Sequence, residues 1–327
     1  MAKLVTIFGG SGFVGRHVAR RMARRGWRVR VAVRRPNQAG FVRPYGTPGQ
    51  VEPVFCNIRD DASVRAALHG ADAVVNCVGT FEKGGRNNFD AVQDQGAGRV
   101  ARLAAEAGVP RMVHVSALGA DADGASAYAR SKAAGEAAVL SHMPEAAILR
   151  PSVIFGPDDR FFNRFAGMTL FGPVLPLFGG NTRFQPVYVD DVAAAVEAAV
   201  TGDAAGIYEL GGPETGTLRD LVCELLEVID RRRIVLNLPF WVGAILGRGL
   251  DIGVALTGRT ISNRILTADQ LRQLRSDSVV AEGARGFADL GIRPIDMSAV
   301  MPDYLWRFRP SGQYAAIKNS AARLRKS

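Results

Sequence analysis

The stretch TIFGGSGFVGRH, residues 6–17, decides the fold of this chain. An apolar run ends at its first glycine, and Gly9, Gly12 and Gly15 follow at the spacing G-x-x-G-x-x-G, just where a helix should begin. Glycine allows a tight turn and a close approach of the backbone to a pyrophosphate, whose charge then lies on unpaired amides at the helix N-terminus. The stretch therefore predicts a dinucleotide site. The residues expected to contact the cofactor in this loop are Gly9, Ser11, Gly12, Phe13, Val14 and Gly15.

The end of the second apolar run indicates which dinucleotide this site prefers. The adenosine ribose should meet a residue about 20 positions beyond the glycines, and nineteen residues lead from Gly15 to Arg34. An NAD-preferring site would place an acidic residue there, whereas the sequence VAVRRP places Arg34 and Arg35, which suit a 2′-phosphate. The sequence therefore predicts NADP(H) as the cofactor.

Strand and helix patterns alternate through the first half of the chain, which predicts a doubly wound parallel α/β sheet. Runs rich in Val and Ile cover 3–8, 28–34, 51–56, 72–78, 111–117 and 146–150, and helical patterns cover 13–25, 61–69, 88–107 and 127–141. We expect a Rossmann domain over residues 1–160, to which 185–206 return. A smaller C-terminal α/β domain, expected to bind partners, then comprises 161–184 and 207–327.

Composition excludes several classes of site. The three cysteines and four histidines are scattered without ligand spacing, so neither a disulfide framework nor a metal site is predicted. This cysteine usage indicates a reduced compartment, and the N-terminus lacks the pattern of a secretory signal.

The net charge of +10 is placed unevenly along the chain. Residues 16–35 contain nine arginines and no acidic residue, and residues 305–327 contain six basic residues and no acidic one. Such runs form either a solvated face or a surface for an acidic partner, such as a phosphate or an anionic lipid. Aromatic residues do not alternate with the charges, which argues against nucleic acid as the partner.

Further motifs resemble the short-chain dehydrogenase/reductase superfamily in its extended and atypical branches. They are GGSGFVG at 9–15, VNCVGT at 75–80, SAYARSKAAGE at 126–136, RPSVIFGP at 150–157 and VYVDDVA at 187–193. The resemblance implies that Tyr128 and Lys132 form the Tyr-x-x-x-Lys pair of that superfamily. It also implies adenine contacts from Asn57 and Ile58, and cofactor contacts from Val78, Gly79, Ser116, Pro151, Ser152 and Val153.

In active members of the superfamily, the tyrosine acts as a general acid or base and a nearby serine or threonine orients the substrate. Here the expected position of that hydroxyl falls at Ala117 or Leu118, and Ser116 lies one or two residues before it. Tyr128 and Lys132 can still hydrogen-bond the nicotinamide ribose. We therefore expect this pair to hold the cofactor as a vestige of an active site, without catalysis.

The second half of the chain is similar to bacterial relatives of the NADPH-binding accessory subunit of respiratory complex I. The similarity lies in ILTADQLRQLRSDSVVA at 265–281, FADLGIRP at 287–294 and YLWRFRPSGQY at 304–314. This resemblance implies one tightly held NADPH, no part in electron transfer, and a role in stabilising the junction of the peripheral and membrane arms. It also implies other complex I subunits as partners, and a peripheral location on the cytoplasmic face of the inner membrane.

The sequence leaves two alternatives open, one on the place of an apolar segment and one on the function. The apolar segment 239–256 could lie at a membrane surface or under a partner subunit, or it could be buried in its own domain. The chain could also be a soluble NADP-dependent reductase, dehydrogenase or epimerase that acts on a sugar nucleotide or a related carbonyl compound.

Overall fold

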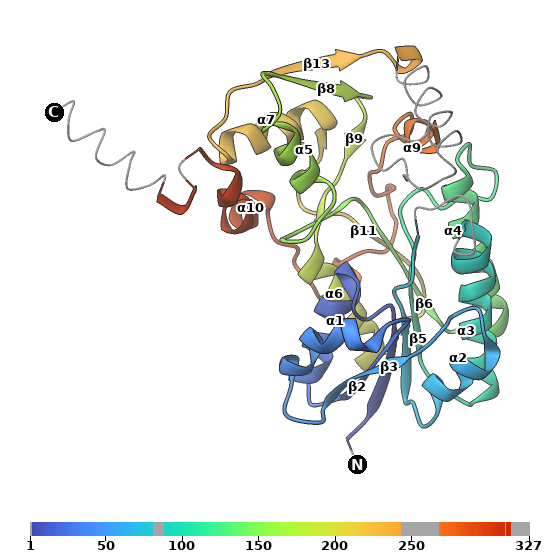
Figure 1. Ribbon diagram of the computed structural model, residues 1–327. Helices are drawn as coiled ribbons and strands as arrows, with labels where there is room; N and C mark the ends of the chain where they lie inside the picture. Colours follow the sequence, from blue (N-terminus) through green and yellow to red (C-terminus); the bar gives the residue numbers. More distant parts are fainter. Residues whose placement is uncertain (1, 81–87, 243–267, 311, 315–327) are drawn as a thin grey trace, which may run out of the picture. The chain divides into compact units, whose positions relative to one another are not determined.

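The computed structural model describes residues 2–80, 88–242, 268–310 and 312–314. The chain divides into two compact units, each with its own hydrophobic core (Figure 1). The first unit comprises Met1–Ser152, Val189–Gly211 and Val280–Pro294. The second unit comprises Val153–Tyr188, Gly212–Val279 and Ile295–Ser327.

Within the described residues, seven strands form the sheet of the first unit in the order β3-β2-β1-β4-β5-β6-β11, and all of them pair in parallel. The order reverses between β1 and β4, so ligands are expected at the carboxyl ends of these strands. The predicted doubly wound parallel sheet is confirmed. The strands are β1 (Leu4–Phe8), β2 (Arg28–Val33), β3 (Val51–Phe55), β4 (Ala73–Asn76), β5 (Met112–Val115), β6 (Ala147–Pro151) and β11 (Gly206–Leu210).

Helices cover both faces of this sheet, which explains why its central strands β1, β4 and β5 are buried along their whole length (Figure 1). On one face lie α1 (Phe13–Arg24) and α6 (Val189–Thr201), and on the other lie α2 (Asp61–Leu68), α3 (Gln95–Glu106) and α4 (Ala127–His142). The 3₁₀ helix η1 (Pro36–Tyr45), the π-helical turn η2 (Asp90–Asp94) and the 3₁₀ turn η3 (Ala288–Leu290) complete the unit.

The second unit has a separate core around Phe155, Phe162 and Leu225. Short strand pairs (β7 with β10, β8 with β13, β9 with β12) accompany its helices. The Tyr304 hydroxyl donates to buried Asp159 at 2.9 Å, which ties α10 to the loop before α5. The elements are β7 (Ile154–Phe155), α5 (Phe162–Met168), β8 (Val174–Phe178), β9 (Arg183–Phe184), β10 (Val187–Tyr188), β12 (Gly216–Thr217), α7 (Leu218–Val228), β13 (Ile234–Leu238), α9 (Ala268–Gln273), α10 (Met297–Leu305), η4 (Trp306–Phe308) and η5 (Gly312–Tyr314).

The division into units can be set beside the domains expected from the sequence. Both have the chain leave the first unit after β6 and return to it near α6. The segment Val280–Pro294 returns as well, because the backbone amide of Glu209 on β11 donates to the carbonyl oxygen of Arg285. Which unit binds which ligand stays a prediction.

Among the described residues, no helix has the length and apolar character needed to cross a membrane. Most of the apolar segment 239–256 lies outside the described residues.

Candidate functional site

The glycine loop between β1 and α1 is shaped by its three glycines. Gly9 has a φ of +74°, which other residues rarely adopt, and the Gly12 amide donates to the Gly9 carbonyl oxygen at 2.9 Å. A Cβ on Gly15 would lie 2.7 Å from the Gly10 Cα atom and closer still to the Gly9 carbonyl oxygen. The loop therefore packs directly on the first turn of α1.

The start of α1 is suited to an anion. Gly12 occupies the N-cap position and has no side chain that could cap the helix. The amides of Phe13 and Val14 belong to the first turn, whose N–H groups have no acceptor within the helix. With Ser11 in the same loop, these amides form the kind of cradle that accepts a pyrophosphate.

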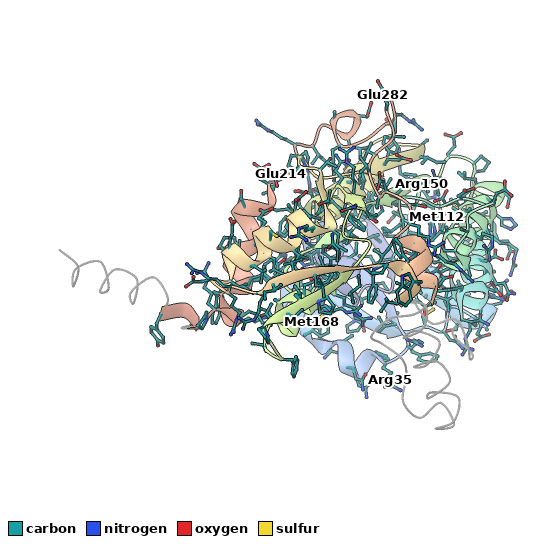
Figure 2. The ribbon with its side chains drawn as sticks, turned by 90° about the horizontal axis from the view of Figure 1, so that it is seen from above. Arg35, Met112, Arg150, Met168, Glu214 and Glu282 are labelled. Atoms are coloured by element: carbon teal, nitrogen blue, oxygen red, sulfur yellow. The ribbon has the colours of Figure 1, made fainter. Side chains whose placement is uncertain are left out.

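Arg34 and Arg35 follow β2 directly, and both side chains are exposed. The Gly9 amide donates to the carbonyl oxygen of Ala32 at 3.0 Å, so the glycine loop is tied to the end of β2. Figure 2 shows Arg35 projecting outward after that strand. The structure thus brings the two predicted arginines to the strand next to the loop.

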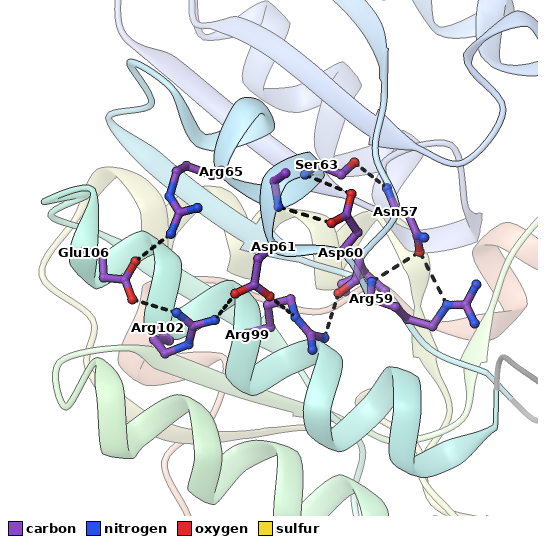
Figure 3. Close-up of polar contacts among 11 residues, drawn as sticks. Asn57, Arg59, Asp60, Asp61, Ser63, Arg65, Arg99, Arg102 and Glu106 are labelled. Atoms are coloured by element: carbon purple, nitrogen blue, oxygen red, sulfur yellow. Dashed lines mark hydrogen bonds and ion pairs between the residues drawn. The ribbon is translucent and has the colours of Figure 1, made fainter.

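Asn57 and Ile58 follow β3 at the same edge of the sheet. The Ile58 side chain packs in the core beneath α2 and α3, whereas Asn57 is only partly buried at the strand end. The side-chain oxygen of Asn57 accepts from the backbone amide of Arg59 at 3.2 Å, and the backbone amide of Asn57 donates to the Ser63 hydroxyl at 2.9 Å (Figure 3). These bonds fix the conformation of the loop between β3 and α2.

An ion-pair network fixes α2 against α3 behind this loop (Figure 3). Asp61 accepts from Arg102 and from Arg99 at 2.5 Å each, and Glu106 accepts from Arg102 at 2.7 Å and from Arg65 at 3.1 Å. The hydrogen bonds from Arg102 and Arg99 hold the pKa of Asp61 below its usual range. Exposed pairs of this kind contribute little individually, so their main effect is to position the helices.

The segment after β4 lies against the glycine loop. A Cβ on Gly9 would lie 3.2 Å from the Val78 side chain, and the Val78 amide donates to buried Asn76 at 3.1 Å. Gly79 is exposed, and a Cβ added there would meet nothing within 4 Å. Val78 and Gly79 therefore offer a shallow backbone surface beside the loop.

Buried Gln93, in the π-helical turn η2, links this segment to α4. Its amide nitrogen donates to the Thr80 carbonyl oxygen at 2.6 Å, and its oxygen accepts from the Ser131 hydroxyl at 2.7 Å. Such π-turns often occur at functional sites. These two hydrogen bonds set the spacing between the segment after β4 and the helix that carries Tyr128 and Lys132.

Ser116, at the end of β5, is buried and its hydroxyl donates to Glu136 on α4. Glu136 is also paired with Arg150 of β6, whose Nη2 lies 2.6 Å from a carboxylate oxygen. The positions after Ser116 are Ala117 and Leu118, which have no hydroxyl. In the structure, the Ser116 hydroxyl therefore serves an internal polar network.

Tyr128 and Lys132 lie on the first turns of α4, which Ser126 caps by accepting from the Ala129 amide at 3.0 Å. The Lys132 Nζ atom lies 6.0 Å from the centre of the Tyr128 ring and donates to the Val115 carbonyl oxygen at 3.2 Å. The structure therefore brings the predicted pair together beside the end of β5.

The pKa values of the pair show what each group can do. Burial raises the pKa of Tyr128 to about 12, so the phenol keeps its proton at neutral pH. Burial also lowers the pKa of Lys132 to about 8, against the opposing charges of Glu136 and Cys77. A protonated phenol and an ammonium group are both hydrogen-bond donors, which suits ribose hydroxyls.

Pro151 and Ser152 end the first unit at β6, and Val153 begins the second. The Pro151 carbonyl oxygen accepts from the Leu118 amide at 2.9 Å, and the Ser152 amide donates to the Leu210 carbonyl oxygen at 2.9 Å. Val153 packs against the core of the second unit. Contact of these three residues with a cofactor stays a prediction.

Part of the basic run 16–35 is satisfied inside the first unit. Arg21 lies 2.8 Å from Asp190 and 3.1 Å from Glu197 of α6, and Arg25 pairs with the same Glu197. Arg30, on β2, donates to the backbone carbonyl oxygens of Ala67 and His69 at the end of α2. Arg21 and Arg25 thus fix α1 against α6, while Arg34 and Arg35 remain exposed.

Together, these residues fit a dinucleotide. The glycine loop forms a cradle that added Cβ atoms would fill. This loop, the arginines after β2 and the two donors on α4 all follow carboxyl ends of parallel strands, and these ends meet at one edge of the sheet. Sequence reasoning missed Asn76, Gln93 and Glu136. A polar residue inside an apolar strand could have indicated Asn76, but no local pattern marks the other two.

Comparison with known proteins extends these findings. The sequence model of the NAD dependent epimerase/dehydratase family matches residues 5–211. The chain is 33% identical over 316 residues to the Arabidopsis thaliana protein NADH dehydrogenase (ubiquinone) 1 alpha subcomplex subunit 9, mitochondrial, covering 94% of this chain and 79% of that one. It is 35% identical over 207 residues to a ceramide reductase of Caulobacter vibrioides, covering 63% of this chain and 64% of that one.

The solved structure of DesIV, a dTDP-glucose 4,6-dehydratase from Streptomyces venezuelae with NAD and TYD bound, shares the fold. The two superpose with a TM-score of 0.70 at 21% identity, covering 96% of this chain and 99% of that one. The chain therefore belongs to the NAD dependent epimerase/dehydratase family and, within it, to the group that contains the alpha subcomplex subunit 9 of complex I.

Proposed function

We propose that this chain is a non-catalytic, NADPH-binding accessory subunit of respiratory complex I that stabilises the junction of its peripheral and membrane arms. The observation that carries the proposal is the extent of the likeness to the Arabidopsis subunit. It covers 94% of the chain, beyond the family match at 5–211 and into the second unit. A dinucleotide fold alone would not require likeness there.

The exposed pair Arg34 and Arg35 supports NADPH over NADH. The glycine loop is tied to the end of β2, which is the strand expected to meet the adenosine ribose. Arg34 and Arg35 directly follow this strand. Arginine binds phosphate by charge-assisted hydrogen bonds, each contributing roughly 1.5–3 kcal/mol. Loss of one arginine should weaken NADPH binding about tenfold or more.

The polar network at the end of β5 supports a non-catalytic role. The Ser116 hydroxyl donates to Glu136, Ala117 and Leu118 have no hydroxyl, and the pKa of Tyr128 is raised to about 12. In this proposal Tyr128 and Lys132 hold the nicotinamide ribose, and the bound nucleotide stabilises the first unit by mass action.

Exposed apolar side chains support partner binding by the second unit. Phe171 is 91% exposed, and Ile234 and Trp241 are each 66% exposed. Together with the basic run 305–327, they suit other complex I subunits and anionic lipid head groups at the cytoplasmic face of the inner membrane. The subunit would then be peripheral, with the first unit holding NADPH and the second binding partners.

Native electrophoresis of membranes solubilised in mild detergent tests this proposal. We expect the chain to migrate with NADH:ubiquinone reductase activity. Migration as a small species, separate from that activity, would contradict it.

A second candidate function is an NADP-dependent reductase or dehydrogenase, or an epimerase on a sugar nucleotide or related carbonyl compound. It is favoured by the Tyr128 and Lys132 pair and by the partial likeness to the Caulobacter ceramide reductase. A screen of carbonyl substrates, sphingoid ketones included, with NADPH and the purified chain would detect it as nucleotide oxidation. Tyr128→Phe should abolish any genuine turnover.

A further inference from the structure

We propose that Arg16 is a third cationic contact for the 2′-phosphate of NADPH, and that Phe41 positions it. This inference deepens the proposed NADPH site and rests on it. It assigns a specificity-determining role to a residue outside both the glycine motif and the arginine pair at the end of β2.

The Arg16 side chain turns back toward the glycine loop from the first turn of α1. Its Nε atom donates to the Gly12 carbonyl oxygen at 3.2 Å, and its Nη2 atom lies 3.5 Å from the carbonyl oxygen of Ser11. Arg21 and Arg25 of the same helix instead extend to carboxylates on α6. The two contacts with Gly12 and Ser11 direct Arg16 at the loop.

The Phe41 ring also contacts this guanidinium group. It belongs to η1, the helix that begins directly after Arg35, and its ring is 45% exposed. The Arg16 Cζ atom lies 5.3 Å from the ring centre. A cation–π contact with an aromatic ring holds a guanidinium group in place without using its N–H donors.

These contacts bring Arg16 next to the segment that follows Arg34 and Arg35. The Gly9 amide ties the loop to the end of β2 through Ala32. The ribose of a bound dinucleotide is expected between the glycine loop and the end of this strand. A 2′-phosphate there would meet guanidinium groups from two sides.

The chemistry of Arg16 suits this role better than a purely structural one. Its acceptors in the loop are neutral carbonyl oxygens, whereas a phosphate carries negative charge and forms stronger, charge-assisted bonds. A guanidinium has five N–H donors in a planar fork, so it can bind phosphate while it still braces the loop. A brace alone would act on NADPH and NADH equally.

This difference defines the experiment. The purified full-length chain is titrated with NADPH and with NADH, and with 2′,5′-ADP and 5′-AMP as competitors that differ only in the 2′-phosphate. The variants are Arg16→Gln, Arg16→Lys and Phe41→Leu. Arg24→Gln is the matched control, because Arg24 is an exposed arginine on the same helix.

We expect Arg16→Gln to weaken binding of NADPH and of 2′,5′-ADP about tenfold, and to leave NADH and 5′-AMP unchanged. Arg16→Lys should recover part of the loss, Phe41→Leu should give a smaller loss of the same kind, and Arg24→Gln should change none of the four. Thermal unfolding of each variant verifies that the fold is retained.

An equal loss for both nucleotides in Arg16→Gln would overturn the inference, and so would no loss for either. If Arg34→Gln lowers the NADPH preference and Arg16→Gln does not, the inference fails while the NADPH proposal stands. If the unaltered chain shows no preference for NADPH, the proposed cofactor itself is wrong.

Discussion

The adenosine end and the nicotinamide end of the candidate site differ in whether their polar side chains are exposed or already hydrogen-bonded within the protein. At the adenosine end, the glycine loop is closely packed and exposed arginines follow β2. At the nicotinamide end, Ser116 is bound to Glu136 and the Tyr128 phenol stays protonated at neutral pH. The adenosine end presents a closely packed loop and exposed arginines, whereas at the nicotinamide end the Ser116 hydroxyl and the Lys132 ammonium group are engaged in buried contacts.

This difference teaches that a Tyr-x-x-x-Lys pattern does not by itself indicate chemistry. Catalysis requires a group whose pKa lies near the working pH and a hydroxyl that can reach the substrate. In this chain the corresponding strand end donates its hydroxyl to a buried ion pair. In the proposed function, the pair on α4 contributes binding alone.

Gly15→Val is expected to have the largest effect, because it disrupts the adenosine end. A Cβ at this position would lie 2.7 Å from the Gly10 Cα atom, so the loop or α1 must move. We expect loss of nucleotide binding and a destabilisation of about 3 kcal/mol or more, as for overpacked interiors. Calorimetry and nucleotide titration measure both effects.

Gly167→Ala is the control for this substitution. Gly167 lies in α5, where a Cβ would meet nothing within 4 Å, so nucleotide binding should stay unchanged and stability should rise by about 0.5–1 kcal/mol. Full NADPH binding by Gly15→Val would contradict the account of the loop.

Glu136→Gln should have the next largest effect, at the nicotinamide end. Glu136 is 4% exposed and pairs with Arg150, and removing one partner of a buried ion pair costs about 3–5 kcal/mol. Chemical denaturation should show that loss, with the ratio of NADPH to NADH affinity unchanged.

In the control Asp203→Asn the carboxylate is 96% exposed, so stability should fall by less than about 1 kcal/mol. Equal losses in the two variants would count against a structural role for Glu136.

Lys132→Met tests the cost of keeping a donor buried. The pKa of Lys132 falls from 10.5 to about 8, which corresponds to about 3 kcal/mol of destabilisation at neutral pH. The unfolded lysine binds a proton between pH 8 and 10.5 that the folded one lacks, so the stability of the parent chain rises with pH in that window.

We therefore expect Lys132→Met to be more stable than the parent chain at pH 7, with the difference shrinking as the pH rises through that window. The variant should also bind NADPH and NADH more weakly, to the same extent. Lys3→Met is the control, because it makes the same replacement at an exposed lysine. A stability difference independent of pH would refute this explanation.

Tyr128→Phe should have the smallest effect. Only a hydroxyl is removed, so we expect a loss of about 1 kcal/mol in binding of both nucleotides, and normal assembly into the complex. Native electrophoresis and an assay of NADH:ubiquinone reductase activity check the assembly. Loss of the activity at normal subunit levels would mean that the phenol does more than hold the cofactor.

Much of the first unit could be predicted from the sequence, because its signals are local. Apolar runs bounded by turns gave the six strands from β1 to β6, and the glycine spacing located the loop. The helix η1 was not expected, since the residues 36–45 have no helical periodicity and include two prolines. Its position still matters, because it carries Phe41.

The rest of the site depends on contacts between residues far apart in the sequence. Gln93 joins Thr80 to Ser131, and Glu136 joins Ser116 to Arg150, across separate strands and helices. No spacing rule connects such residues. The same holds for the arginines of α1, whose partners on α6 follow about 170 residues later.

The most direct test is to purify the chain with its partners from detergent-solubilised membranes and to quantify the nucleotide released on denaturation, before and after turnover with NADH and quinone. The account predicts a stoichiometric amount of NADPH that co-purifies with NADH:ubiquinone reductase activity and stays reduced. A preparation without NADPH, or one in which NADP⁺ accumulates during turnover, would contradict it.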